Sequence, residues 1–181
     1  EDFPDLAAGD FPNTFAIAGA DLRALIEKTR FAISTEETRY YLNGIYFHDV
    51  AAGGLLRAVA TDGHRLAYAS ATLDVEVPRQ EVILPRKTVL ELQRLLSDAE
   101  GAIEMRFASN QAKFSFDGME FVTKLVEGKF PDYNRVIPKG HRNNLTLGRQ
   151  ALLSCLQRTA ILTSDKFKGV RLNLDPGSLR V

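Results

Sequence analysis

The sequence predicts an α+β fold, in which a pseudo-twofold domain carries two helices on one face of antiparallel β-sheets. The main observation is a repeated order of elements, since residues 15–126 spell strand, helix and three strands twice. A second observation is the turn chemistry between strand-like runs. Asp62-Gly63 reads as the turn of a hairpin, and Asp117-Gly118 joins two later runs.

The first copy begins with a short strand-like run at residues 15–19. Residues 21–31 are expected to form a helix, because Leu22, Leu25 and Ile26 recur at helical spacing. Three further strands are expected at residues 39–48, 55–61 and 65–73.

The second copy repeats this order with other residues. A strand is expected at residues 82–84 and a helix at 87–96, where Val89, Leu92 and Leu96 lie on one apolar stripe behind Pro85. Its last three strands are expected at residues 102–107, 113–116 and 120–125.

A third copy begins near residue 145. Residues 145–147 echo the first strand, and residues 149–159 echo the first helix. The tripeptide Phe3-Pro4-Asp5 recurs as Phe130-Pro131-Asp132, just before each copy starts. Matching linkers and matching starts predict tandem similar domains. The last copy stops at Val181 after about a third of a domain, so we expect the chain to be a fragment.

Composition sets the limits on function. The 23 basic residues balance 23 acidic ones, so the net charge predicts no partner. A single cysteine, Cys155, cannot form an internal disulfide, which favours a reducing compartment. The sequence contains no run of about 18 apolar residues, the length needed to span a membrane. The acidic start Glu1-Asp2 is not typical of a signal peptide. We expect a soluble, cytoplasmic protein without membrane contact.

The expected helices are more basic than the rest of the chain, and Arg23 lies on the first of them. A basic helix face suits a phosphate backbone, because cations that neutralise phosphates release counterions without reading bases. The alternative, open at this point, is that these lysines and arginines only keep exposed helix faces soluble.

Two long runs carry a resemblance to a known family. They are Ala60-Thr61-Asp62-Gly63-His64-Arg65-Leu66-Ala67 and Lys129-Phe130-Pro131-Asp132-Tyr133-Asn134-Arg135-Val136-Ile137-Pro138. Shorter runs at residues 39–44, 85–87 and 166–172 occur in the same order as in that family. Together they resemble the β sliding clamp, the β subunit of bacterial DNA polymerase III, essentially from end to end.

The resemblance implies the DNA-clamp fold and three domain pieces. Residues 1–13 would end a first domain, 14–137 would form a complete middle domain, and 138–181 would begin a truncated third. It also implies a noncatalytic processivity factor without a cofactor. Full-length members form a homodimeric ring around duplex DNA and hold replicative polymerase, clamp loader and other proteins with a clamp-binding motif. The fragment alone is expected to be monomeric.

The resemblance also implies two sets of binding residues. Tyr40, Tyr41, Arg86 and Lys87 would contact DNA, although aromatic residues also favour ordinary strand packing. A hydrophobic peptide pocket would comprise Leu42, Thr61, Gly63, His64, Arg65, Leu66, Pro131, Arg135, Val136 and Phe167. Its apolar members would form a cup for a Leu or Phe anchor, and Arg65 and Arg135 would hold acidic or carbonyl groups. Without the resemblance, the apolar members would read as core.

The residues also allow two other classes of function to be considered for this chain, an enzyme and a protein-interaction scaffold. Asp62 and His64 could bind a metal with His48 or His141, as in a metal-dependent phosphoesterase, but the three histidines have no metal-binding spacing. Cys155 lies on an apolar helix face, and no Gly-rich phosphate loop occurs, so no enzyme activity is expected. A protein-interaction scaffold that does not bind DNA would keep the pocket but show no salt-dependent affinity for duplex.

Overall fold

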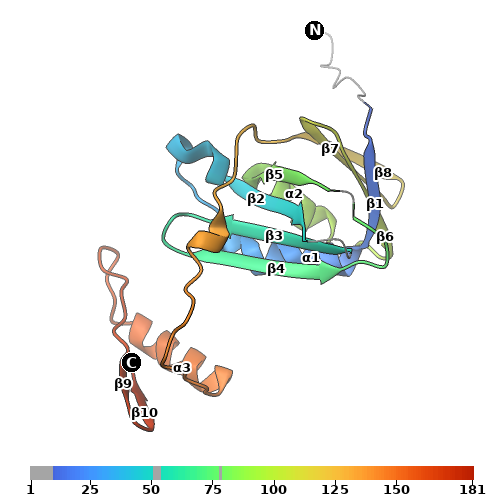
Figure 1. The fold of residues 1–181 in the computed structure, drawn as a ribbon. Coiled ribbons are helices and arrows are strands. Elements are labelled where there is room, and N and C mark those ends of the chain that lie inside the picture. The colour runs from blue at the N-terminus through green and yellow to red at the C-terminus, as the bar shows by residue number, and fades with distance from the viewer. Residues whose placement is uncertain (1–9, 51–53, 78) are drawn as a thin grey trace. The chain divides into compact units, whose positions relative to one another are not determined.

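The computed structural model describes residues 10–50, 54–77 and 79–181 (Figure 1). It divides into two compact units, Glu1–Pro131 and Asp132–Val181. The first unit contains both predicted repeats. Their elements are β1 (Asn13–Ala18), α1 (Gly19–Thr29), β2 (Gly44–Asp49), β3 (Leu55–Thr61) and β4 (Leu66–Thr72), then β5 (Glu81–Pro85), α2 (Arg86–Leu95), β6 (Ala102–Phe107), β7 (Gln111–Phe116) and β8 (Met119–Lys124). The predicted order of strand, helix and three strands, twice over, is confirmed.

The two repeats exchange their first strands. One sheet has the order β1-β6-β7-β8 and the other β4-β3-β2-β5, and every neighbouring pair is antiparallel. In the exchanged pairs Ile17 lies opposite Ile103, and Tyr46 lies opposite Ile83. Each sheet therefore needs residues from both repeats, and neither repeat makes a complete sheet by itself.

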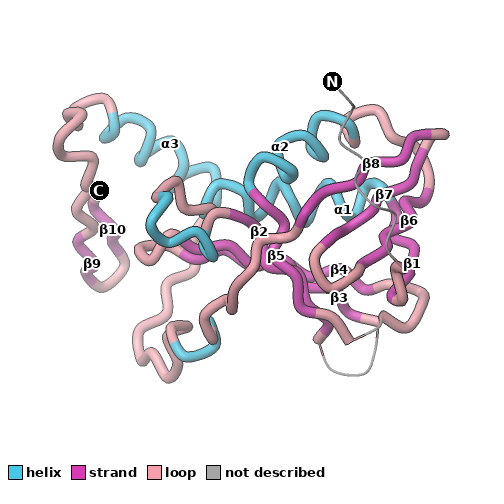
Figure 2. The backbone as a smooth tube through the Cα atoms, turned by 90° about the horizontal axis from the view of Figure 1, so that it is seen from above, coloured by secondary structure: helices cyan, strands magenta, loops and turns pink. Residues whose placement is uncertain are grey.

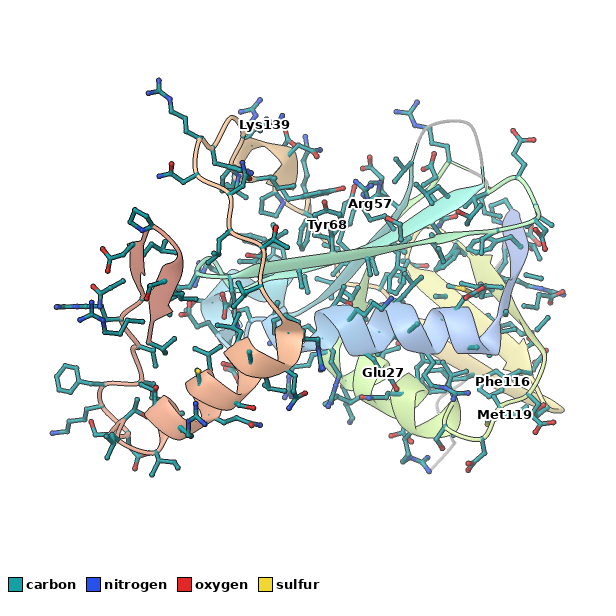
Figure 3. The ribbon with its side chains drawn as sticks, turned by 90° about the horizontal axis from the view of Figure 1, so that it is seen from below. Glu27, Arg57, Tyr68, Phe116, Met119 and Lys139 are labelled. Atoms are coloured by element: carbon teal, nitrogen blue, oxygen red, sulfur yellow. The ribbon has the colours of Figure 1, made fainter. Side chains whose placement is uncertain are left out.

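The two helices lie side by side and on the same side of the strands (Figures 2 and 3). Helix α1 packs on β3 and β4, and α2 packs on β2 and β5. Leu22 and Ile26 of α1 and Val89 and Leu92 of α2 are fully buried in the same core as both sheets. Full burial of such a side chain contributes about 1.5–3 kcal/mol, so this shared face holds the domain together.

The structure corrects two of the expected strands. Residues 39–42 belong to a 3₁₀ helix, η2 (Glu37–Leu42), and only the part from Gly44 onward is a strand. The backbone here bonds locally, since the Asn43 N–H donates to the Tyr40 carbonyl at 3.0 Å. Residues 145–147 form no strand, because a strand needs a partner and none of the described strands pairs with them.

The second unit contains a short 3₁₀ helix, η3 (Tyr133–Arg135), the helix α3 (Arg149–Ala160) and a hairpin of β9 (Asn173–Asp175) and β10 (Ser178–Arg180). The predicted helix at 149–159 is confirmed. No residue of α3 is buried, and Cys155 on it is half-buried, with the Arg158 Nη2 donating to its Sγ at 3.3 Å.

Candidate functional site

The turn between β3 and β4 is organised by one carboxylate. We call residues 61–66 the Asp62 loop. Asp62 Oδ1 accepts the backbone N–H groups of His64 and Arg65 at 2.9 and 3.0 Å, and Oδ2 accepts the Arg65 Nε at 3.0 Å. The Thr61 hydroxyl donates to the Arg65 carbonyl at 2.8 Å and accepts the Gly63 N–H at 3.1 Å. The loop is therefore a fixed structure, although Gly63, His64 and Arg65 are exposed.

The same contacts set the charge state of Asp62. Desolvation tends to raise the pKa of Asp62, but the backbone N–H groups of His64 and Arg65 and the Arg65 guanidinium together lower it below its usual value. Asp62 is thus an anion whose oxygens are engaged by the loop itself. Among the described residues, no group of three or more His, Cys, Asp and Glu side chains could hold a metal ion.

The backbone conformation at Gly63 favours glycine, and the Arg39 guanidinium lies directly against this residue. Its φ of +89° lies in the left-handed region, which favours glycine. A Cβ at this position would lie 2.6 Å from the Arg39 Nη1, so the guanidinium occupies the space that a side chain would need. Gly63 therefore lets Arg39 lie directly against the loop.

Arg39 joins the Asp62 loop to η2, which we call the tyrosine segment. Its Nη2 donates to the Asp62 carbonyl at 3.1 Å, and its Nε and Nη2 donate to Glu36 Oε2 at 3.0 and 2.8 Å. Glu36, an acid beside the expected DNA contacts, is therefore paired with a cation. Sequence reasoning did not select Arg39, because its partner in the Asp62 loop is distant along the chain.

The outer surface of the Asp62 loop presents polar and apolar groups together. The Arg65 guanidinium lies over the Phe31 ring at 5.6 Å, and 55% of Phe31 is exposed. His64 is exposed and Leu66 is half-buried, whereas Leu42 is only 4% exposed and belongs to the interior. Phe31 was not among the expected pocket residues; its large exposed ring is a signal only once the fold places it beside Arg65.

The remaining expected pocket residues lie at or beyond the end of the first unit. Pro131 is exposed at its last residue, and Arg135, Val136 and Phe167 are exposed in the second unit. Arg135 donates through its Nε to Asp132 Oδ2 at 3.1 Å, the same pairing that links Arg65 to Asp62. A role for these four residues in peptide binding stays a prediction.

The expected DNA-contacting residues lie on two adjoining segments. Tyr40 is 57% exposed and meets Tyr41 edge to face, with ring centroids 5.7 Å apart. The Asn43 carbonyl, just after the tyrosine segment, accepts the Arg86 N–H at 2.9 Å, so the first turn of α2 begins beside it. Both tyrosines lie in a 3₁₀ helix, so the alternative that they serve strand packing is wrong.

Arg86 and Lys87 are exposed at the start of α2, where no acidic residue and no side-chain cap is present. Cations oppose the helix dipole at an N-terminus, so helix stability does not explain their place there. Arg23 differs from them, because it is half-buried and its Nη2 donates to the Ala99 carbonyl at 3.4 Å. Its guanidinium is therefore held against the backbone, and DNA contact by Arg23 stays a prediction.

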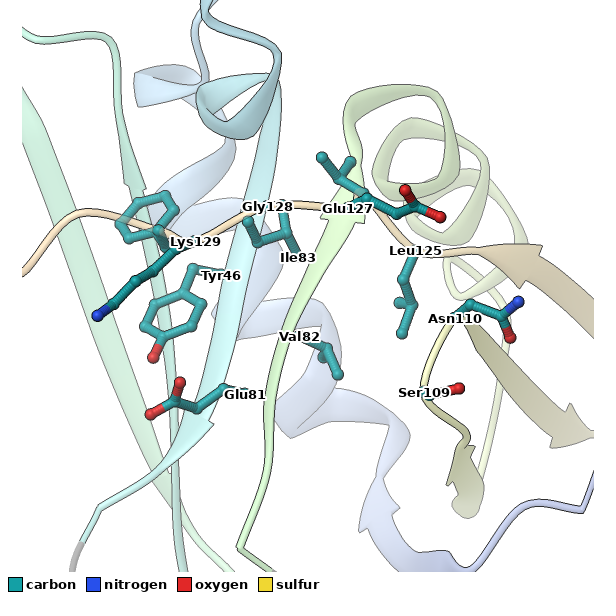
Figure 4. Close-up of a pocket in the computed structure, with 12 residues that line it drawn as sticks. Tyr46, Glu81, Val82, Ile83, Ser109, Asn110, Leu125, Glu127, Gly128 and Lys129 are labelled. Carbon is teal, nitrogen blue, oxygen red and sulfur yellow. The ribbon is translucent and has the colours of Figure 1, made fainter.

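The segment after β8 contacts the rest of the first unit near both of its ends. We call residues 125–131 the linker. Its Leu125 and Val126 N–H groups donate to the carbonyls of Asn110 and Ile83 at 2.9 and 3.0 Å, and the buried Phe130 ring stacks on Tyr46 at 4.7 Å. A pocket of about 370 Å³ lies beside it, with Tyr46, Glu81 and Lys129 on one side and Ser109, Asn110 and Leu125 on the other (Figure 4). Sequence reasoning missed the stacking of Phe130 on Tyr46.

The interlocked repeats and the helix pair place the first unit in the DNA-clamp class of α+β domains. The described helices include none that is long and apolar enough to cross a membrane. The family model for the central domain of the DNA polymerase III beta subunit matches residues 16–132, and the chain belongs to that family.

Known relatives agree with this assignment. The chain is 43% identical to the beta sliding clamp of Pseudomonas aeruginosa, covering 99% of this chain and 49% of that protein, and 42% identical to that of Caulobacter vibrioides, covering 97% and 50%. A solved DnaN sliding clamp from Bartonella birtlesii superposes with a TM-score of 0.88 at 42% identity, covering 96% of this chain and 47% of that one. The chain spans about half the length of the curated relatives it matches.

Proposed function

We propose that this chain is the central part of a sliding clamp, a noncatalytic factor that keeps a DNA polymerase on duplex DNA by enclosing it. Membership of the beta subunit family is the observation that carries the proposal. As a full-length homodimeric ring, the protein would hold replicative polymerase, clamp loader and other proteins with a clamp-binding motif. Catalysis is not part of the proposal, because the one organised carboxylate of the loop, Asp62, is engaged by its own loop.

The DNA-facing surface comprises Tyr40, Tyr41, Arg86 and Lys87. The cations suit phosphates, and the exposed tyrosine can hydrogen-bond or stack without reading sequence. Replacing Arg86 and Lys87 with Ala is expected to reduce the slope of log affinity against log salt by about one for each phosphate that is no longer neutralised. The measurement is duplex binding by a full-length clamp carrying this sequence, at several salt concentrations. Lys113→Ala is the control, because Lys113 pairs with Glu120 on the β7–β8 sheet surface.

A slope that these two substitutions leave unchanged would contradict the DNA assignment. It would favour the alternative, a protein-interaction scaffold that does not bind duplex. That alternative keeps the peptide surface and predicts no salt-dependent affinity for DNA at all.

The peptide-docking surface centres on the Asp62 loop. Leu66 supplies an apolar contact, and the Arg65 guanidinium is held by Asp62 Oδ2 and Phe31, where it can bind a carboxylate or carbonyl of an extended peptide. Among similar structures, those from Bartonella birtlesii and Pseudomonas aeruginosa are bound to griselimycin. A C. crescentus beta sliding clamp has PEG bound to its putative beta-motif tethering region. These bound molecules support a docking surface in this family.

Titration of a full-length clamp with a labelled peptide, a Gln followed by Leu and Phe anchors, tests the docking surface. Leu66→Asp is expected to abolish binding, because it places a charge where an apolar anchor would lie. Arg65→Ala is expected to weaken binding with little change in thermal stability, because an exposed ion pair contributes at most about 1 kcal/mol. Thermal melting checks that both variants stay folded. Arg106→Ala is the control, since Arg106 forms a similar exposed ion pair with Glu104 on β6. Equal affinity in wild type and Leu66→Asp would remove the assignment.

A further inference from the structure

The tyrosine segment contacts two other segments of the first unit, the Asp62 loop and the linker. Through Arg39 it reaches the Asp62 carbonyl at 3.1 Å and lies under Gly63. Through Tyr40 it lies against the linker, because a Cβ on Gly128 would be 3.3 Å from the Tyr40 Cε2. One short 3₁₀ helix therefore contacts both the Asp62 loop and the linker.

The link to the Asp62 loop depends on the shape of a guanidinium. Nε and Nη2 of Arg39 hold Glu36, Nη2 also holds the Asp62 carbonyl, and Nη1 faces Gly63. A planar fork with five N–H donors can make these contacts at once, whereas a lysine ammonium can occupy only one of the positions. Arg39 is therefore specific to this junction, and its charge alone would not replace it.

We propose that Arg39 is a positioning residue that couples the tyrosine segment to the Asp62 loop, so that duplex DNA and a docking peptide bind cooperatively. The inference rests on the proposed function, because it takes Tyr40 and Tyr41 as DNA contacts and the Asp62 loop as the peptide contact. DNA bound to the tyrosines restricts the motion of the tyrosine segment, and Arg39 transmits this restriction to the Asp62 loop. Peptide binding then costs less conformational entropy of the loop. The coupling is positive, and by linkage it acts equally in both directions.

Hydrogen exchange on this chain tests the link without any ligand. In Arg39→Lys, the amides of Gly63, His64 and Arg65 are expected to exchange faster by about tenfold or more, because the loop opens more often. Arg94→Lys is a matched control: Arg94 donates through Nε and Nη2 to Glu91 with the same three-residue spacing but makes no contact with the loop. Unchanged exchange in Arg39→Lys, or equal acceleration in both variants, would overturn the proposal.

Peptide affinity with and without DNA tests the coupling. A full-length clamp carrying this sequence is titrated with an uncharged docking peptide, alone and with saturating duplex, so that the peptide and DNA do not repel each other. Duplex is expected to tighten peptide binding by about fivefold, the lower end of typical coupling. In Arg39→Lys the factor is expected to fall to one, and in Arg94→Lys to stay at the wild-type value.

The two arms separate failure of this inference from failure of the proposed function. A wild-type clamp that binds both ligands with no change in peptide affinity would overturn the coupling and leave the proposed function intact. A clamp that binds neither ligand would overturn the proposed function and the coupling with it. A coupling factor that survives in Arg39→Lys would show that another contact carries it and would overturn the role of Arg39.

Discussion

The two repeats of the first unit use the same scaffold but connect it differently. In the first, residues 30–43 lead from α1 to β2 through two 3₁₀ helices, η1 (Arg30–Ala32) and η2, and residues 62–65 join β3 to β4. In the second, residues 96–101 lead from α2 to β6, and the tight turn Asp117-Gly118 joins β7 to β8. The second repeat demonstrates how little chain the fold needs. The additional chain of the first repeat carries Arg39, Tyr40, Tyr41 and Arg65, which belong to the proposed binding surfaces and their junction.

The two repeats differ most at the glycines where β2 and β6 begin, and the largest predicted effect on the free energy of unfolding lies there. Gly44 begins β2, and a Cβ on it would lie 2.1 Å from the Leu84 carbonyl oxygen, which is fixed in the neighbouring strand. Gly101 precedes β6 with a φ of +93° and open space around it. Gly44→Ala is expected to lower the free energy of unfolding by about 3 kcal/mol or more, and Gly101→Ala by about 1–2 kcal/mol.

Urea denaturation of both variants measures this difference. Equal losses would mean that β5 can move away from β2 at little cost, and that the tyrosine segment is not held by a tight strand junction.

The two hairpin turns give a second contrast, which appears in binding more than in stability. Gly63 and Gly118 occupy equivalent turns with φ of +89° and +72°, so an alanine at either position costs about 1–2 kcal/mol. Only at Gly63 would the new Cβ meet Arg39, while Gly118 has open space. Gly63→Ala is expected to weaken peptide binding by about tenfold, equivalent to about 1.4 kcal/mol, and Gly118→Ala to leave it unchanged.

Peptide titration of both variants, with thermal melting as a check on folding, distinguishes a local effect from a global one. Loss of binding in Gly118→Ala as well would make stability, and not the Asp62 loop, the cause.

The smallest predicted effect is a pH dependence specific to the first turn. Because the pKa of Asp62 is lower in the folded state, the ionised carboxylate stabilises the fold fully above its unfolded pKa of about 3.9. That contribution is lost as the pH falls through the folded pKa. Between neutral pH and about pH 3, wild type is expected to lose more stability than Asp62→Asn, as measured by urea denaturation at each pH. Parallel losses would contradict the role given to this carboxylate.

The sequence predicted what depends on local pattern. The residues of β3 and β6 were predicted without error, since apolar runs bounded by turn residues end where the strands end. The strand exchange between repeats was not predicted, because the partners of β1 and β5 are far away in the sequence. Tyr40 and Tyr41 were expected in a strand, and the local bonding of the 3₁₀ helix overrode that propensity.

The same division holds for the candidate site. The Asp62 loop was found because Asp62-Gly63 is a turn signal and because its neighbours resemble a known family. Arg39 and Phe31 were missed, since each matters only through a residue that the fold brings beside it. The stack of Phe130 on Tyr46 was missed for the same reason.

The exchanged first strands also affect how the domain is made. During synthesis β1 leaves the ribosome early, but its sheet neighbour β6 follows only after most of the domain has been translated. At roughly 5–20 residues per second, Phe15 and Ile17 are synthesised several seconds before β6, the strand that pairs with them. The nascent chain therefore has no half-domain that is complete in itself, and the first repeat stays open to chaperones until the second arrives.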